Sequence, residues 1–164
     1  MSTTKIDKLH HAAYRCRDAE ETRKFYEDFI GLPLVNAFEI HETKTGRTTD
    51  TIHVFFQMAD GTHVAFFETN DHSFEFKEQH DYDLHLALEV SYPHLEAMLQ
   101  KGKDAGMTVR GIADHKVMHS IYFRDPNGYV LELTARVDGH DEGMNPETNG
   151  ARDNLAKWMA RKNS

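Results

Sequence analysis

The sequence predicts an α+β fold made of two consecutive copies of one unit, each a strand, a helix and three further strands. Two observations lead to this prediction. An amphipathic helical segment at residues 18–31 follows one apolar strand and precedes three, and the same order recurs from residue 84 onward. His11 also precedes Gly31 by 20 residues, while His85 precedes Gly106 by 21. A recurring order at nearly constant spacing indicates an internal duplication.

The first copy begins with the strand "KLHHAAYRC", followed by the helix. Asp18 is expected to cap this helix, with Glu21 completing a capping box, and Gly31 and Pro33 end it. Its inner stripe is expected to consist of Thr22, Phe25, Tyr26, Phe29 and Ile30. Three strands follow, around 34–40, 51–58 and 62–68, and the turn "ADG" joins the last two.

The second copy begins with the strand "LHLALEV". Pro93 opens its helix, which runs to about Ala105, and Gly106 closes it. Strands are expected around 107–113, 118–124 and 129–136, the last two joined by "DPNG".

We therefore expect one domain over residues 1–137, with modules at about 6–70 and 82–136 and a polar linker at 69–82. Residues 138–164 form a polar tail with a short helix near 150–161. Leu155, Trp158 and Met159 lie on one side of that helix, and this side either covers a cavity or packs on a partner chain.

Composition excludes several kinds of partner. A net charge of -8 without a basic cluster argues against nucleic acid and against an anionic membrane surface. No apolar run has the length of a membrane span and the start has no signal-peptide core, so we expect a cytoplasmic protein. The single cysteine fits a reducing compartment. No phosphate-binding loop is present, which argues against a nucleotide cofactor.

Glu132 is the first candidate functional residue, because it is a carboxylate in an apolar strand. In a strand it shares a face with Val130 and Thr134, while Leu131 and Leu133 point the other way. Either that face is wet, or the carboxylate is buried against a cation or a metal.

The duplication relates two histidines to each other. His11 and His85 open equivalent strands, so they can converge on one cavity if the two copies face each other. Two imidazoles and a carboxylate are the set that leaves coordination positions open on ferrous iron.

These segments resemble the vicinal oxygen chelate superfamily, which includes glyoxalase I, fosfomycin-resistance proteins and type I extradiol dioxygenases. The resemblance covers residues 6–136 and rests on "HHAAYRCRD", "FYEDFIGLPL", "HLALEV" and "IYFRDPNGYVLEL". It implies paired βαβββ modules whose strands form a curved mixed sheet around a cavity with a divalent metal. The positions that match the family's ligands are His11, His85 and Glu132. His10 competes with His11, and the spacing to Asp18 favours His11.

Alignment of the two copies locates the fourth ligand that glyoxalase-type members use. Aligning "ADGTHVAFFE" with "PNGYVLELTA" makes Ala65 the position equivalent to Glu132. Alanine has no ligand atom in its side chain, so this fourth ligand is absent. Glu68 lies near, but an odd spacing from Ala65 turns it to the other face unless the strand is bulged. A site with three protein ligands is therefore favoured.

The pattern is closest to that of type I extradiol dioxygenases. His63 shares the face of Ala65, where those enzymes carry a histidine that handles the substrate's proton. A second sequence marker of those enzymes is matched here by His115, Tyr122, "DPNG" and Glu132, in that order. The match fails at Ala113, where the pattern prefers other residues. The resemblance implies Fe(II), with Mn(II) or Zn(II) as other ions, O₂ and a catecholic substrate of aromatic catabolism. His63, His115 and Tyr122 are the implied catalytic residues.

Two other functions stay open. An isomerase or lyase acting on a vicinal-oxygen substrate, such as a cis–trans isomerase of a ring-cleavage product or a glyoxalase-like enzyme, would use the same residues as proton carriers without O₂. A resistance protein that sequesters a planar ligand would not need all three metal ligands. Because extradiol enzymes of this type usually contain two such domains, we expect a homodimer or larger assembly, with the site within one chain or between two.

Overall fold

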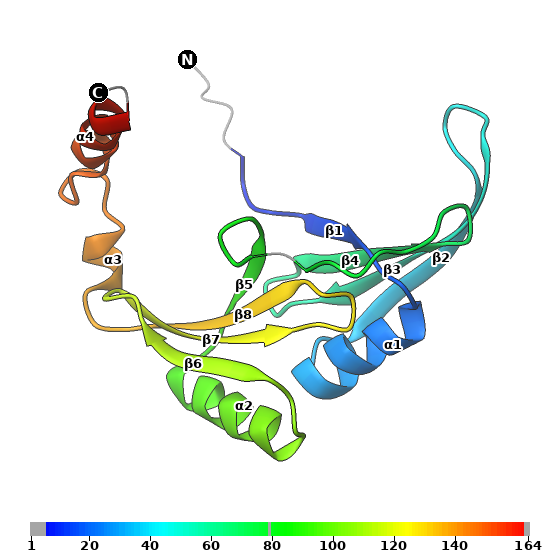
Figure 1. Cartoon of the computed structure of the whole chain (residues 1–164), viewed down its shortest axis with the longest axis horizontal. Helices are drawn as coiled ribbons and strands as arrows, with labels where there is room; N and C mark the ends of the chain where they lie inside the picture. The colour runs from blue at the N-terminus through cyan, green and yellow to red at the C-terminus, as the bar shows by residue number, and fades with distance from the viewer. Residues whose placement is uncertain (1–5, 79, 163–164) are drawn as a thin grey trace. The chain divides into compact units, whose positions relative to one another are not determined.

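The computed structural model describes residues 6–78 and 80–162. Its strands and helices follow the order β1, α1, β2, β3, β4 and then β5, α2, β6, β7, β8, with two further helices at the end (Figure 1). They form two four-stranded sheets with equivalent strand orders, β1-β4-β3-β2 and β5-β8-β7-β6. The predicted duplication into paired βαβββ modules is therefore confirmed.

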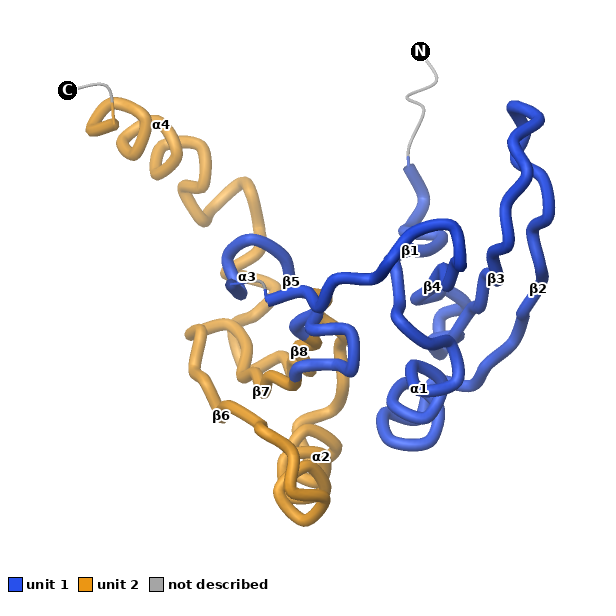
Figure 2. Tube along the Cα trace, turned by 45° about the vertical axis from the view of Figure 1, so that its right-hand side comes forward, with its two compact units in different colours: residues 1–85, 124–130 blue, residues 86–123, 131–164 orange. Residues whose placement is uncertain are grey.

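The chain divides into two compact units, coloured separately in Figure 2. Unit 1 comprises the chain up to His85 together with Arg124–Val130, and unit 2 comprises Leu86–Phe123 and the chain from Leu131 onward. The turn "DPNG" therefore belongs to unit 1, although the strands on either side of it lie mostly in unit 2.

Unit 1 contains β1 (His11–Arg15), β2 (Leu34–Glu42), β3 (Thr48–Gln57) and β4 (His63–Thr69). β1 pairs with β4 in parallel, and β3 is antiparallel to both β2 and β4. The helix packs on one face of this sheet, where Tyr26 lies against Phe56 and Phe66 at ring-centroid distances of 5.6 and 4.8 Å. Phe56 and Phe66 are fully buried, so the core of unit 1 lies between the helix and this face.

The first helix begins and ends where the sequence predicts, with two local differences. The Asp18 carboxylate accepts a hydrogen bond from the Glu21 amide at 2.7 Å, and Gly31 ends the helix at φ +97. However, the Glu21 carboxylate bonds to the Arg17 guanidinium, so the expected reciprocal half of the capping box is replaced by an ion pair. The segment is an α-helix, α1, only over Ala19–Arg23 and continues as a π-helix over Lys24–Ile30. Phe29, a residue of the predicted inner stripe, is half-buried in this segment.

Unit 2 contains α2 (Tyr92–Asp104), β6 (Val109–Asp114), β7 (Met118–Arg124) and β8 (Val130–Arg136), apart from the residues of the turn and its flanks that belong to unit 1. β5 (His85–Glu89) begins at the last residue of unit 1. The core of unit 2 lies between one face of α2 and one face of the sheet. It contains Leu95, Met98, Ile121, Phe123, Leu131 and Leu133. Gly102 permits close packing here, since a Cβ at this position would lie 2.6 Å from the Phe123 ring.

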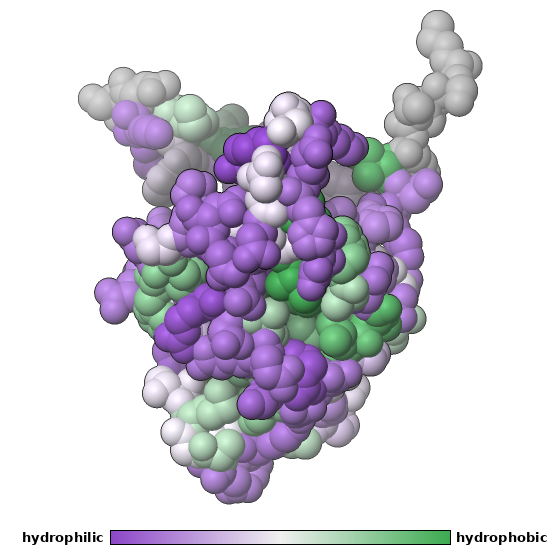
Figure 3. Space-filling view, turned by 90° about the vertical axis from the view of Figure 1, so that its right-hand side faces the viewer, coloured by the Kyte–Doolittle hydropathy of each residue, from purple (hydrophilic) through white to green (hydrophobic). Residues whose placement is uncertain are grey.

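The tail contains a short helix that the sequence did not predict, α3 (His140–Gly143), and the expected helix α4 (Ala151–Lys162). Leu155, Trp158 and Met159 on α4 are exposed by 63%, 59% and 44%. Within residues 6–78 and 80–162, no helix has both the length and the apolar character that crossing a bilayer would require. The face shown in Figure 3 is largely hydrophilic, with apolar patches between the polar side chains.

Candidate metal and catalytic residues

The sheet of unit 1 presents three cross-strand rows on the face opposite α1, which we call the helix-free face. The register pairs His11 with His63 and His63 with Gln57, which gives the first row. The second row consists of Ala13, Ala65 and Phe55, and the third of Arg15, Phe67, His53 and Phe38. Successive rows lie two residues apart along each strand, so these side chains share one face.

His11 and His63 occupy the first row together, and His63 shares the face of Ala65, as the alternation along the strand predicts. His11 is exposed, and its Nδ1 lies 2.8 Å from Nδ1 of His10. His63 is half-buried, with Nε2 at 3.3 Å from Gln57 Nε2 and Nδ1 at 3.4 Å from the His10 carbonyl oxygen. The competing neighbour His10 therefore contacts both candidate residues.

Ala65 lies in the middle of the second row, fully buried between Ala13 and Phe55. The position opposite Glu132 in the repeat therefore offers no ligand atom. Glu68 lies on the other face, where its carboxylate accepts a hydrogen bond from the Ala19 amide at 2.6 Å. The prediction that Glu68 turns away from this face is confirmed, and its carboxylate satisfies a backbone amide at the start of α1.

His85 is held in one tautomer by the backbone before it. Its ring is exposed, and Nδ1 lies 2.7 Å from the Asp81 carbonyl oxygen. A carbonyl can only accept, so the proton is on Nδ1 and the lone pair is on Nε2. Metal-ligating histidines usually have their second nitrogen fixed in this way.

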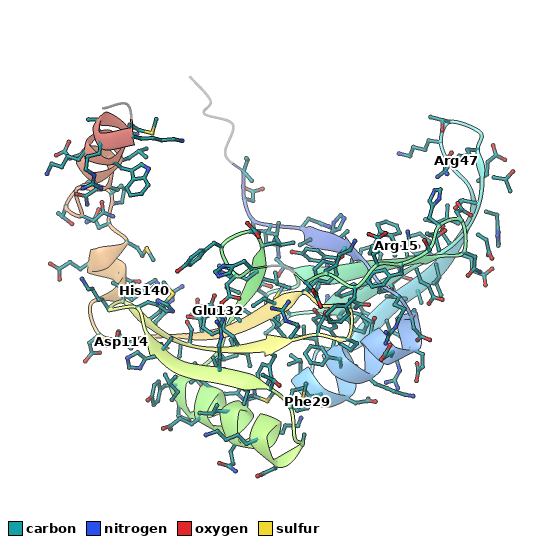
Figure 4. The ribbon with its side chains drawn as sticks, in the orientation of Figure 1. Arg15, Phe29, Arg47, Asp114, Glu132 and His140 are labelled. Carbon is teal, nitrogen blue, oxygen red and sulfur yellow. The ribbon has the colours of Figure 1, made fainter. Side chains whose placement is uncertain are left out.

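Glu132 is buried, with 4% of its surface exposed, so the wet-face interpretation of this carboxylate is wrong. Its strand, β8, sends Leu131 and Leu133 into the core against α2, as the predicted alternation requires. On the other face, Thr134 accepts a hydrogen bond from the Ser120 hydroxyl at 3.1 Å. Glu132 lies on β8 and is labelled in Figure 4.

Glu132 belongs to a hydrogen-bonded chain with two of the predicted catalytic residues. Tyr122 on β7 hydrogen-bonds to the Glu132 carboxylate, and its hydroxyl lies 2.8 Å from His115 Nε2. An ionised carboxylate only accepts, so the hydroxyl donates to Glu132 and must accept from His115. The proton of His115 is therefore on Nε2, and the order is imidazole N–H, phenol O–H, carboxylate.

The electrostatic environment keeps the phenol of Tyr122 protonated. Burial raises its pKa above 10.0, and the Glu132 charge raises it further. A hydrogen bond with Ser120 lowers this pKa, and the Arg110 guanidinium, 4.9 Å from the centre of the Tyr122 ring, lowers it as well. The phenol is therefore a hydrogen-bond donor at neutral pH, and its hydroxyl faces the Glu132 carboxylate.

Four phenylalanines of β3 and β4 divide between the two faces of the sheet. Phe56 and Phe66 are fully buried in the core, whereas Phe55 and Phe67 lie in rows two and three of the helix-free face. His53, which sequence reasoning did not single out, lies beside Phe67 at a centroid distance of 3.6 Å. The pairing of β3 with β4 brings His53 beside Phe67, and the sequence of β3 alone did not indicate this neighbour.

The donor types suit a divalent metal, although the described part of the chain holds no preformed group of three acidic, histidine or cysteine side chains close enough to bind one. His85 has the carbonyl-fixed tautomer of a ligating histidine. Glu132 is a buried carboxylate, and buried carboxylates require cations or donors.

Comparison with known proteins agrees with this fold. Residues 8–133 match the family model described as the Glyoxalase/Bleomycin resistance protein/Dioxygenase superfamily. No curated protein matches the chain significantly.

Three solved structures illustrate the similarity of the fold. A glyoxalase/dioxygenase from Nostoc punctiforme is 19% identical with a TM-score of 0.62, covering 84% of this chain and all of that one (100%). A glyoxylase/bleomycin resistance protein/dioxygenase domain from Frankia sp. EAN1pec is 17% identical with a TM-score of 0.64, over 81% and 100%. A mutant of the fosfomycin resistance protein FosX from Listeria monocytogenes, in complex with Mn(II) and 1S,2S-dihydroxypropylphosphonic acid, is 20% identical with a TM-score of 0.59, over 84% and 99%.

The match over residues 8–133, with the two equivalent βαβββ sheets, shows that this chain belongs to the glyoxalase/bleomycin resistance/dioxygenase superfamily, also called the vicinal oxygen chelate superfamily.

Proposed function

We propose that the chain is a metal-dependent enzyme that opens the ring of a catecholic substrate with O₂, in the manner of an extradiol dioxygenase. His11, His85 and Glu132 are its proposed metal ligands, with Fe(II) as the working ion and Mn(II) or Zn(II) as other ions that this donor set accepts. The observation that carries the proposal is the chain His115–Tyr122–Glu132, which joins two predicted catalytic residues to a predicted ligand.

Bound Fe(II) would supply the electron transfer that makes O₂ reactive toward a coordinated catechol. His63 is assigned the proton of a substrate hydroxyl, because it shares a row with His11 and a neutral imidazole can accept a proton near neutral pH. Gln57, at 3.3 Å from His63 Nε2, orients that ring.

His115 and Tyr122 are assigned the stabilisation of negative charge that develops on the substrate oxygens. The hydroxyl of Tyr122 lies 2.8 Å from His115 Nε2, so a proton can pass between them: a protonated imidazole that gives its Nε2 proton to the phenolate becomes neutral, and the phenol is restored. Glu132 orients this pair through its hydrogen bond with the Tyr122 hydroxyl.

Phe55 supplies an apolar wall for the ring. It lies in row two, with its centroid 5.7 Å from His11 and 5.9 Å from His63. The neighbouring Ala13 in the same row is exposed and has a small side chain, so no large side chain of row two covers this flank of Phe55.

An isomerase or lyase is the second candidate, favoured by the fact that the proton relay from His115 to Tyr122 works equally well without O₂. The cis–trans isomerisation of a ring-cleavage product, or a glyoxalase-like rearrangement, requires proton carriers of this kind. Sequestration of a planar ligand is the third candidate. The homodimeric state, the single domain over residues 1–137 and a cytoplasmic location stay predictions.

The test is oxygen consumption by the full chain, reconstituted with Fe(II) without air and then given a panel of catechols and catechol acids. We expect uptake with a yellow ring-opened product, and its loss in His63→Ala and Glu132→Ala. His41→Ala is the matched control, because His41 lies on β2 of the same sheet and its ring pairs with the exposed carboxylate of Glu39.

Stoichiometric metal binding without oxygen uptake on any catechol would reject the ring-cleavage function. The search would then move to conjugated ring-cleavage acids, with the appearance of an isomer measured by chromatography. Ligand binding that is indifferent to metal and to all three ligand substitutions would favour sequestration.

A further inference from the structure

Arg15 is a cation on the helix-free face of unit 1 that no predicted role uses. It lies in row three, four residues along β1 from His11, and is labelled in Figure 4. Its Nη2 donates to the carbonyl oxygens of Thr69 at 3.0 Å and His72 at 2.6 Å. Its Nε is buried and has no hydrogen-bond partner.

The charge of Arg15 is not neutralised by these contacts. Backbone carbonyls orient a guanidinium but carry no net charge, and within the described residues no carboxylate forms an ion pair with Arg15. A half-buried cation without a counter-charge costs free energy, which an anion would recover. Guanidinium groups are suited to carboxylates because they present several N–H donors in one plane.

A second unsatisfied polar atom lies in the same row. Nε2 of His53 is buried without a hydrogen-bond partner, and only 7% of the residue is exposed. Phe67 stands between Arg15 and His53 in the register, and Phe38 flanks His53 at 5.4 Å. Row three therefore combines a cation, an unpaired imidazole nitrogen and two aromatic rings, a set that fits the polar end of a planar ligand.

We propose that row three is an anion subsite in which Arg15 binds a carboxylate of the substrate, so that the substrate is a catechol carrying an acid group. This inference rests on the proposed function, because the catechol end is assigned to the row of His11 and His63. His53 is assigned a hydrogen bond to the same end of the ligand as Arg15.

The spacing of the rows defines the length of that substrate. Rows one and three are four residues apart on β1, which is about 13 Å along a strand. The Arg15 guanidinium points toward the end of β4, since it bonds to Thr69 and His72. A carboxylate directly on the catechol ring is too short to reach it, whereas an acid on an extended chain or a second ring is long enough.

The experiment measures this length directly in the unmodified protein. Three acids are titrated calorimetrically into the full chain with Zn(II), which supports no oxygen chemistry: 3,4-dihydroxybenzoate, 3-(3,4-dihydroxyphenyl)propanoate and 5-(3,4-dihydroxyphenyl)pentanoate. Each is compared with its methyl ester, which has nearly the same length and no charge. We expect the preference for acid over ester to grow along the series, to tenfold or more for the longest acid.

Variants then assign the preference to its residue. Arg15→Met should bring the ratio of ester Kd to acid Kd close to one, and Arg15→Lys should keep part of it. Arg17→Met is the matched control, because Arg17 is an exposed arginine near Arg15 whose side chain pairs with Glu21. Its ratio should equal that of the unmodified protein.

A ratio near one for every acid in the unmodified protein, or the same ratio in Arg15→Met, would overturn the anion subsite. Binding of the esters shows that a variant is folded, which separates a lost charge from a lost structure. A length-dependent acid preference without oxygen uptake under Fe(II) would reject ring cleavage and leave the subsite in place.

Discussion

Nε2 of His115 lies 2.8 Å from the hydroxyl of Tyr122, and the hydroxyl in turn bonds to the buried carboxylate of Glu132. The three residues come from the turn between β6 and β7, from β7 and from β8. Each hydrogen bond fixes the direction of the next, because only the carboxylate is restricted to accepting. A substitution at Tyr122 should therefore change the hydrogen bonding of both His115 and Glu132.

Tyr122→Phe should lower the catalytic rate strongly and the stability of the fold only slightly. It removes the hydroxyl that joins His115 to Glu132, and we expect kcat for ring opening to fall by about 10²-fold, the usual size of an acid–base contribution. The free energy of unfolding should fall by only about 1–3 kcal/mol, because Glu132 loses one donor. Steady-state oxygen uptake and urea unfolding measure the two effects.

The control for this substitution is Tyr92→Phe on α2, whose hydroxyl takes no part in the proposed chemistry. A Tyr122→Phe variant with unchanged kcat and an unchanged pH profile would contradict the relay. A loss that scales only with stability would assign Tyr122 a structural role.

Glu132→Gln should weaken metal binding while leaving the shape of the site unchanged. The amide has nearly the volume of the carboxylate and can still accept from Tyr122, but it lacks the negative charge. We expect the Kd for Mn(II) to rise at least about 10-fold, which corresponds to about 1.4 kcal/mol. Glu96→Gln, an exposed residue on α2, should bind Mn(II) as tightly as the unmodified chain.

Asp125 is expected to be essential for the turn that joins β7 to β8. Its carboxylate accepts from the amides of Asn127 and Tyr129 at 2.9 and 2.8 Å, and from the Tyr26 hydroxyl at 3.1 Å. Asp125→Ala leaves these donors buried and unpaired, at about 1–3 kcal/mol each. We expect the protein to lose at least about 3 kcal/mol of stability, measured by urea unfolding.

A smaller substitution checks that assignment. Tyr26→Phe removes only one of the donors and should cost about 1 kcal/mol, because the carboxylate keeps its two backbone bonds. Equal losses in Asp125→Ala and Tyr26→Phe would mean that the backbone bonds contribute nothing.

Local pattern and duplication were sufficient to predict the strands and the face on which each residue lies. Alternation placed His63 on the face of Ala65 and Glu68 on the opposite face, because side chains alternate strictly along an unbulged strand. The same rule placed Leu131 and Glu132 on opposite faces of β8, and both are buried. These predictions required no knowledge of which strands pair.

The remaining features depend on pairing, which no single segment encodes. His53 joins Phe67 and Arg15 in one row only through the register of β3, β4 and β1. Likewise, Tyr122 and Glu132 are ten residues apart, but this even spacing did not show that they share a face. A turn lies between them, and a turn can shift the register by one residue and so reverse the face. The π-helical winding after Arg23 was hidden as well, because its apolar spacing imitates that of an α-helix.

Cys16 should behave as an inert thiol until the protein unfolds. It is buried, and burial raises its pKa from 9.0 to about 12. At pH 8 only about one thiol in ten thousand would be ionised, and the thiolate is the reactive form. We expect labelling by a thiol reagent to proceed only at the rate of unfolding, and to become fast in denaturant.

The same shift makes stability depend on alkaline pH. Between pH 9 and about 12 the folded chain holds the Cys16 proton more tightly than the unfolded chain does. The free energy of unfolding must therefore fall as the pH rises through this range, and the contribution is fully present below pH 9. Cys16→Ala should lack this part of the decline, which urea unfolding at pH 8 and pH 10.5 measures. Equal slopes in the two proteins would show that the thiol titrates normally and is reached by solvent.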